Sequence, residues 1–166
     1  NGPADYYEVT ITKFELYNGT EWITVFSGAC PALNIAAVGS GRVGNFLSGL
    51  SMPDGTYTQV RVTPGATFSI RGDDGAGSYT TAAVGPNAGS TPTLNVNLKA
   101  TCVITLTGNN VPTAQTQNFS STPVTVTNNT SSHKIRVSFD LSNSIQTIAG
   151  ELFPAPPSVT LTLTPQ

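Results

Sequence analysis

The sequence predicts an all-β protein, an antiparallel β-sandwich of about eight to ten strands. Three observations carry this prediction. Threonine, a residue that favours strands, occurs 25 times. The 16 glycines and 12 prolines are spread along the chain, so no segment can continue for long as a helix. Segments in which apolar and polar residues alternate recur about every ten to fifteen residues, with turn sequences between them.

The first two strands are expected to form a hairpin. Residues 7–17 alternate, but the apolar phase shifts near Thr12, which predicts a bulge there. Asn18-Gly19 favours a tight turn into a second strand over residues 21–26.

Shorter strands follow along the chain. Residues 33–35 are expected to form one, and Pro53-Asp54-Gly55 is a turn sequence. The remaining expected strands cover residues 56–63, 66–71, 94–98, 102–106, 124–126 and 135–141.

The last strand, Ser158 to Thr164, alternates strictly, with Val159, Leu161 and Leu163 on one face and threonines on the other. The proline-rich residues before it cannot continue a helix or a central strand. We therefore divide the chain into a sandwich domain, residues 1–152, and a spacer with a terminal strand, residues 153–166. An apolar terminal strand pairs either within its own sheet or with a neighbouring subunit. The three aliphatic residues form a candidate donor strand, and residues 1–7 are a second candidate.

The amino-acid composition limits where the protein is expected to be found and what it is expected to bind. Charged residues make up 10% of the chain, against roughly a quarter in ordinary soluble domains, and the net charge is −2. Since no cluster of Lys and Arg occurs, we expect no nucleic-acid partner. No apolar run is long enough to insert the mature chain into a membrane. A hydroxyl-rich, weakly charged chain that starts at Asn1 fits an extracellular or cell-surface protein whose signal segment has been removed.

Two cysteines, Cys30 and Cys102, lie outside any metal-binding spacing. In an exported sandwich they are expected to form a disulfide, which would stabilise the fold by roughly 4 kcal/mol. The alternative is a pair of buried thiols in a cytosolic protein.

The sequence offers no persuasive active site, so we expect no enzyme, no metal and no cofactor. His133 is the only histidine and lies in a Ser- and Asn-rich turn. Asp73 and Asp74 could supply oxygen ligands to calcium, but their spacing does not match a calcium loop and favours a plain turn.

Two further patterns concern glycans. Four asparagines precede x-Ser/Thr and are candidate glycosylation sites, although such matches also arise by chance in a polar chain: Asn18, Asn118, Asn128 and Asn129. Four aromatic residues cluster around the first hairpin and could form a carbohydrate platform: Tyr6, Tyr7, Tyr17 and Trp22. For Trp22, core packing is the more economical interpretation.

The segment from Ala4 to Arg71 carries a set of structural motifs. They are Pro3-Ala4-Asp5, the strand Val9 to Leu16, Trp22-Ile23-Thr24-Val25, Leu33-Asn34-Ile35, and Leu50 with Pro53 to Val62. With these motifs the segment resembles a bacterial envelope-protein family of unknown function. The resemblance implies a secreted or lipid-anchored sandwich of the transthyretin or carboxypeptidase-regulatory type. The expected strand arrangement is therefore immunoglobulin-like or transthyretin-like. It implies no catalytic residues.

One departure from that family bears on assembly. The family usually has another strand ahead of the acidic-Ala-Pro turn, whereas this chain begins at that turn. The resemblance therefore implies an incomplete sandwich that a donated strand completes.

These observations favour a structural subunit of an extracellular filament or pilus-like surface polymer. Its partners would be copies of itself, joined head to tail by strand donation. The alternative is a monomeric secreted or surface-anchored module that binds a glycan or a protein. That module would use loops over residues 43–52 and 72–89, and its terminal strand would fold back into its own sheet.

Overall fold

The fold starts with the expected hairpin of β1 (Ala4–Tyr17) and β2 (Trp22–Ser27). The structure is a computed structural model, and it describes residues 1–28, 30–36, 51–81, 84–86 and 99–166. Gly19 in the connecting turn has a φ of 95°, which suits glycine. The register of β1 shifts against its neighbours within residues 9–15. The predicted hairpin and the predicted bulge are both confirmed.

A long strand, β5 (Gln59–Gly72), pairs antiparallel with β1 along most of its length and forms the centre of the larger sheet. The sequence predicted two strands here, because Pro64 and Gly65 interrupt the alternation. The structure instead bends a single strand through both residues, and Pro64 faces Ile11 between two register shifts. A proline is tolerated at such an irregularity because the ladder is already interrupted there.

The larger sheet has the strand order β2-β1-β5-β7-β6, with β3 beside β1 and β8 beside β5. All of its pairs are antiparallel except the parallel pair of β6 and β7. The strands that complete it are β3 (Leu33–Asn34), β6 (Val84–Pro86), β7 (Cys102–Thr105) and β8 (Gln115–Asn118).

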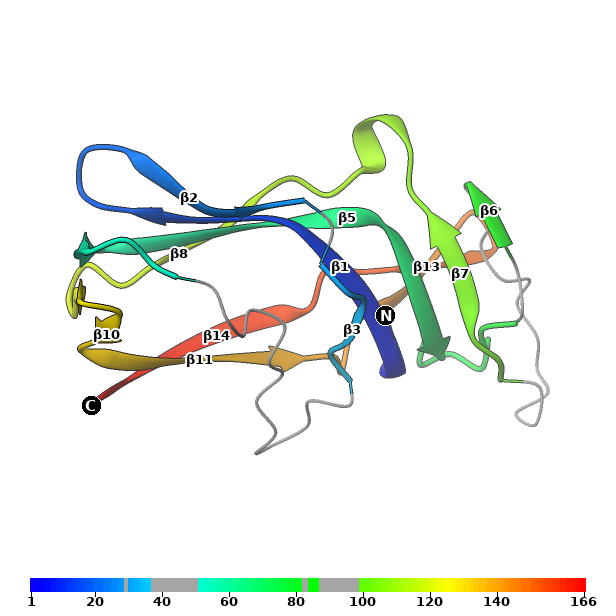
Figure 1. Cartoon of the computed structure of the whole chain (residues 1–166). Coiled ribbons are helices and arrows are strands. Elements are labelled where there is room, and N and C mark those ends of the chain that lie inside the picture. The colour runs from blue at the N-terminus through cyan, green and yellow to red at the C-terminus, as the bar shows by residue number, and fades with distance from the viewer. Residues whose placement is uncertain (29, 37–50, 82–83, 87–98) are drawn as a thin grey trace.

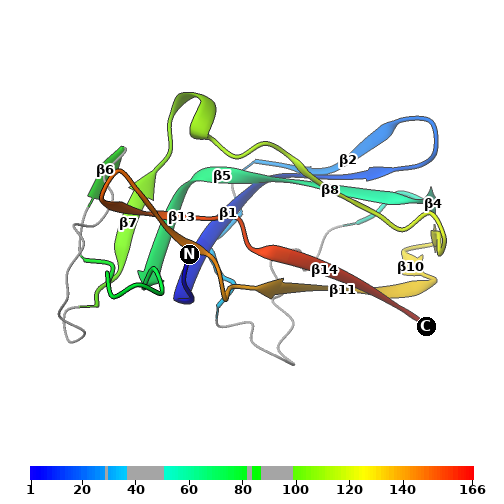
Figure 2. The same cartoon turned by 180° about the vertical axis from the view of Figure 1, so that it is seen from behind.

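The second layer is built from three smaller groups of strands, and Figures 1 and 2 show β11 and β14 of this layer beneath the larger sheet. The first group is β4 (Gly55–Tyr57), β9 (Val124–Thr127) and β10 (Thr130–Ser131). The second is β11 (His133–Asp140) with β14 (Ser158–Pro165). The third is the hairpin of β12 (Ile145–Ile148) and β13 (Glu151–Pro154). A short 3-10 helix, Gly108–Asn110, lies between β7 and β8.

Two apolar clusters fill the space between the layers. One lies toward the N-terminal end of β1, and its buried residues include Tyr7, Ile70 and Ile104. The other lies toward the β1–β2 turn and includes Leu16, Tyr57 and Val126. The predicted all-β, sandwich-like fold with antiparallel sheets is confirmed.

The predicted disulfide is not present: Cys30 and Cys102 are buried thiols. The strand order explains the correction. The amide of Cys30 bonds to Ile11 on the β2 side of β1, whereas Cys102 pairs with Ile70 on the far side of β5. Three strand-to-strand steps separate them, about 14 Å, whereas a disulfide requires Cα atoms within about 7 Å of each other.

Several other expectations can be compared with the structure. Strands near residues 33–35, 102–106, 124–126 and 135–141 are present as β3, β7, β9 and β11. The strand expected over 94–98 lies outside the described residues, as do parts of the expected binding loops, residues 43–50, 82–83 and 87–89. Sequence reasoning missed the β12–β13 hairpin. Within the described residues, no helix has the length and apolar character needed to span a membrane.

Candidate functional site

The terminal strand β14 lies in a two-stranded ribbon with β11, hereafter the β11–β14 ribbon. Eight consecutive residue pairs join the strands, from His133 opposite Pro165 to Asp140 opposite Ser158. The predicted alternation is confirmed: Val159, Leu161 and Leu163 are half-buried, and the threonines between them are exposed. Within a single chain, the candidate donor strand is therefore paired with a strand of the second layer.

The ribbon is held loosely against the rest of the molecule. Its residues are all half-buried or exposed, and Val137 is 36% exposed although it shares a face with Ile135. Ile135, Leu161 and Leu163 pack against the cluster around Leu16, but the buried side chains of both clusters come from outside the ribbon. The neighbouring β12–β13 hairpin, by contrast, fully buries Ile145 and Leu152.

Each strand of the ribbon has an edge without a strand partner among the described residues. β11 pairs with β14, and β14 pairs with β11, and neither joins the three-stranded group or the larger sheet. Unpaired backbone N–H and C=O groups along such edges are templates for pairing with another strand.

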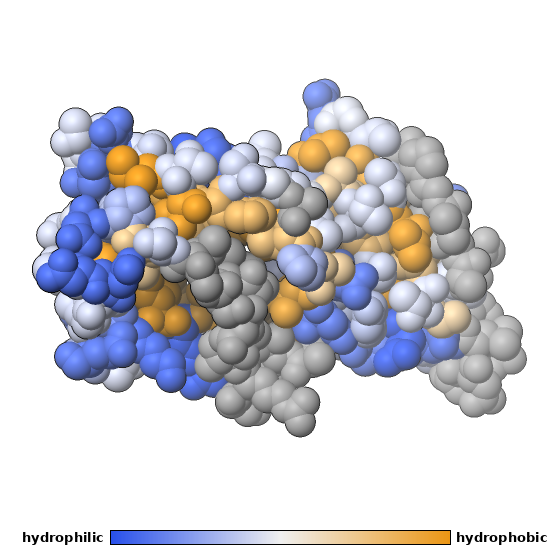
Figure 3. Space-filling model, viewed as in Figure 1, coloured by the Kyte–Doolittle hydropathy of each residue, from blue (hydrophilic) through white to orange (hydrophobic). Residues whose placement is uncertain are grey.

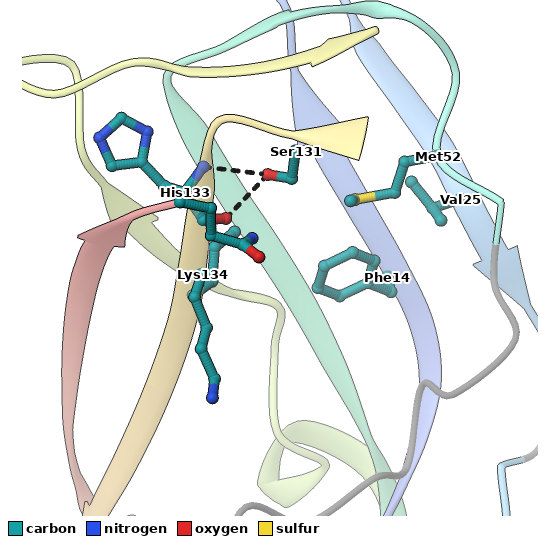
Figure 4. Close-up of a pocket in the computed structure, with 8 residues that line it drawn as sticks. Phe14, Val25, Met52, Ser131, His133 and Lys134 are labelled. Atoms are coloured by element: carbon teal, nitrogen blue, oxygen red, sulfur yellow. Dashed lines mark hydrogen bonds between the residues drawn. The ribbon is translucent and has the colours of Figure 1, made fainter. Parts of the chain in front are cut away.

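A cavity of about 310 Å³ lies between the ribbon and the inner face of the larger sheet. Figure 4 shows Phe14, Val25 and Met52 on its β1–β2 side, facing the start of β11. At the rim, the Ser131 hydroxyl donates to the His133 carbonyl over 2.8 Å. Figure 3 shows hydrophobic surface between hydrophilic borders at this end of the molecule. The cavity therefore offers an apolar wall beside an unpaired strand edge.

The segment before β14 is anchored up to Ala155. The Ala155 amide donates to the Ser144 carbonyl over 2.8 Å, and the Tyr7 hydroxyl donates to the Ala155 carbonyl over 3.1 Å. Burial raises the pKa of the Tyr7 hydroxyl, so it remains a neutral donor. Residues 153–155 thus belong to the body of the fold, and Pro156-Pro157 alone connect it to β14.

The N-terminal segment, the second candidate donor, is built into the body. Gly2 and Ile145 exchange two backbone hydrogen bonds of 2.8 and 3.0 Å, and the Ala4 amide donates to the Leu141 carbonyl. Tyr7 is 3% exposed and lies in the core. Releasing this segment would open the core, so it is a poorer donor than β14.

Trp22 lies on the outer face of the larger sheet, which corrects the core interpretation. It pairs with Tyr17, and the two ring centroids are 5.2 Å apart. The Arg61 guanidinium lies 4.1 Å from the centre of the Trp22 ring. Val60 is buried between the layers, and successive side chains of a strand point to opposite faces of the sheet. Arg61 therefore points to the outer face, where it contacts Trp22.

Beneath Trp22, a buried carboxylate organises the outer face. Glu15 is 3% exposed and accepts two hydrogen bonds from Arg61, of 2.7 and 2.9 Å. Lys13 Nζ lies 2.7 Å from Glu15 Oε1. Arg61 foremost, then Lys13, lowers the pKa of Glu15 to about 2, against the opposing effect of burial.

Asp73 and Asp74 cap the turn that follows β5. The Asp73 carboxylate accepts from the Gly75 amide, and that of Asp74 accepts from the Ala76 and Ser78 amides. Lys99 Nζ lies 3.1 Å from Asp73. The described residues contain no group of three or more His, Cys, Asp or Glu placed to hold a metal ion.

The four candidate glycosylation asparagines are all exposed and lie in or next to turns. Asn18 accepts hydrogen bonds from the Thr20 and Glu21 amides. Asn118 ends β8, and its side chain accepts from the Ser120 amide. Asn128 and Asn129 form the β9–β10 turn, with φ angles of 51° and 62°. Whether they carry glycans stays a prediction.

His133 begins β11, half-buried, with its Nδ1 2.8 Å from the Ser132 hydroxyl oxygen. This geometry suits a residue at a strand entrance.

The chain was compared with family models, curated proteins and solved structures, and none of them matches it.

Proposed function

We propose that this protein is a structural subunit of an extracellular filament or pilus-like surface polymer, in which β14 of one copy completes a neighbouring copy. The observation that carries the proposal is the position of β14. It is an apolar strand in a two-stranded ribbon, attached to the body through two prolines. No fully buried core residue belongs to it, so its release removes only half-buried side chains, Leu161 and Leu163, from the cover of one cluster.

The energetics are compatible with strand donation. Inserting three half-buried aliphatic side chains contributes about 3–5 kcal/mol before the cost of ordering the strand and the subunits. The eight residue pairs of the ladder can be formed equally well within one chain or between two. Further contacts between subunits would bury side chains that the single chain leaves half-exposed, and they would favour the polymer.

The composition agrees with a surface polymer. Few charges and many exposed threonines allow subunits to pack closely without strong repulsion. We therefore place the protein outside the cell or on its surface, with copies of itself as partners.

The test is to image the full-length protein by electron microscopy over a range of concentrations, alongside a chain that lacks residues 158–166. We expect filaments from the full chain and none from the shortened chain. The control variant is Ile148→Ser, which changes an exposed apolar residue outside the ribbon and should leave filaments intact. A full chain that stays monomeric throughout would contradict the proposal.

A second candidate function, a monomeric binding module for a glycan or a protein, is favoured by the Tyr17–Trp22 pair on the outer face. Paired aromatic rings on an open surface can stack against sugar rings. Micromolar binding of a glycan by the monomer, abolished by Trp22→Ala, would favour this function over the filament.

A further inference from the structure

The structure carries an inference about where the donated strand goes, which rests on the proposed function. An acceptor must offer an unbroken backbone ladder and apolar positions that match every second residue of the donor. β11 does so for eight residues, with Phe139 opposite Val159, Val137 opposite Leu161 and Ile135 opposite Leu163.

The other edges of the described sheets fit less well. Outside the β11–β14 ribbon, β2 is the longest edge strand of the described sheets, with six residues, and its pairing with β1 contains a register shift. β8, β6 and β3 are shorter still, with four, three and two residues. None of these could pair with all eight residues of β14.

Pro156 and Pro157 form the hinge of β14, because the chain before them is fixed to the body and the strand follows directly after them. Two hydrogen bonds fix Ala155 to the body, whereas Pro156 and Pro157 have no N–H group to donate to a ladder. Consecutive prolines favour an extended, stiff conformation of about 3.1 Å per residue. A released β14 would therefore project away from its own body.

We propose that β14 leaves its own β11 by turning about Pro156-Pro157, and pairs with β11 of the next copy in the register found within one chain. The acceptor is the place that β14 vacates, so each copy both donates and accepts. Head-to-tail donation that does not close into a ring produces a filament.

The test uses two chains that each carry one new cysteine. Arg136 and Thr162 face each other across the ribbon, and both are exposed. Arg136→Cys and Thr162→Cys chains are unfolded together, refolded, allowed to assemble and oxidised. We expect disulfide-linked dimers in the mixture and none from either chain alone. The double variant should give a ladder of linked multimers.

Two controls define the register and the site. Ser158 lies opposite Asp140, four residues from Arg136, so Ser158→Cys with Arg136→Cys should give about tenfold fewer dimers, because a disulfide tolerates little separation. In the body, Thr56 and Thr125 have hydroxyl oxygens 3.3 Å apart, so Thr56→Cys with Thr125→Cys in one chain should link within the monomer. If the first pair impairs folding, Lys134→Cys and Thr164→Cys provide a second in-register pair.

The outcomes separate this inference from the proposed function. Filaments in which the double variant links only within monomers would overturn the exchange and leave the filament in place. Linked species that stop at closed dimers would support the acceptor site and contradict the filament. A protein that never associates would overturn both.

Discussion

At the scale of single residues, two buried polar side chains differ in whether they have hydrogen-bonding or ionic partners. Glu15 keeps its charge because Arg61 and Lys13 surround it, although its side chain is nearly inaccessible. Ser144 is fully buried, and its hydroxyl has no hydrogen-bond partner among the described residues. Removing one member of a buried ion pair destabilises the fold because the other charge is left without a partner, and an unsatisfied buried hydroxyl costs free energy as it stands.

Replacing Glu15 should make the stability less dependent on acid. Its pKa is about 2 in the folded chain, against an ordinary 4.5, so its contribution is complete above pH 4.5 and is lost as the pH falls toward 2. At pH 7 we expect Glu15→Gln to lower the free energy of unfolding by about 1–2 kcal/mol. Urea unfolding of both proteins between pH 7 and pH 2 measures this difference, which should vanish at the acidic end.

The exposed Glu151 provides the control. Glu151→Gln should change the free energy of unfolding by less than about 0.5 kcal/mol at any of these pH values. Equal effects of the two substitutions, or a Glu15→Gln deficit that persists at pH 2, would contradict the assignment.

Ser144→Ala should stabilise the protein. Removing a buried hydroxyl without a partner is expected to raise the free energy of unfolding by about 1 kcal/mol. Thr80 is the matched case, since its buried hydroxyl donates to the Ala100 carbonyl over 2.7 Å and accepts from the Gly72 amide. Thr80→Val should therefore lower the free energy by about 1–3 kcal/mol. Thermal and urea unfolding would show opposite signs, and a loss of stability in both variants would be evidence against this account.

At the scale of elements, the features that the sequence predicted correctly depend on residues that lie close together in the chain. Asn18-Gly19 fixed the first hairpin, and the phase shift near Thr12 revealed the bulge. Alternation identified β14 and the face that carries Leu161. For the β12–β13 hairpin the sequence held only a glycine at position 150 between two apolar segments, and the nearby prolines suggested a spacer. In the structure both turn residues, Ala149 and Gly150, have positive φ.

Pairings distant in sequence could not be predicted in this way. β4 pairs with β9 almost seventy residues later, and its neighbour β5 belongs to the other layer. Which face Trp22 occupies, and how far Cys30 lies from Cys102, both depend on that arrangement. Alternation within a strand says which residues share a face but not which strand lies beside it.

The two hairpins of the second layer should differ in how strongly they hold the fold. Leu152 in β13 is fully buried, so Leu152→Ala should lower the free energy of unfolding by about 2–5 kcal/mol. Leu161 in β14 is half-buried, and Leu161→Ala should cost about 1–2 kcal/mol in the monomer. Both values come from urea unfolding of monomeric protein. A larger loss from Leu161→Ala would mean that β14 is an integral part of the core, contrary to its proposed release.

At the scale of the whole molecule, a well-packed body and a loosely held ribbon coexist in one chain. The body contains both buried clusters, and half-buried side chains of the ribbon cover each of them: Phe139 packs against one, and Ile135, Leu161 and Leu163 pack against the other. Such a division is what an exchangeable strand requires, because the subunit must remain folded while the strand moves. The central claim is that the chain without β14 stays folded and binds that strand from another copy.

Titrating a chain that ends at Pro157 with a labelled peptide of residues 158–166 tests this claim most directly. Fluorescence anisotropy should show saturable binding of one peptide per chain. A peptide with Val159, Leu161 and Leu163 replaced by serine should bind at least about tenfold more weakly, because its apolar face is gone. Circular dichroism should show that the shortened chain keeps its β structure. A folded shortened chain that does not bind the native peptide, or one that unfolds and is not rescued by it, would contradict the account.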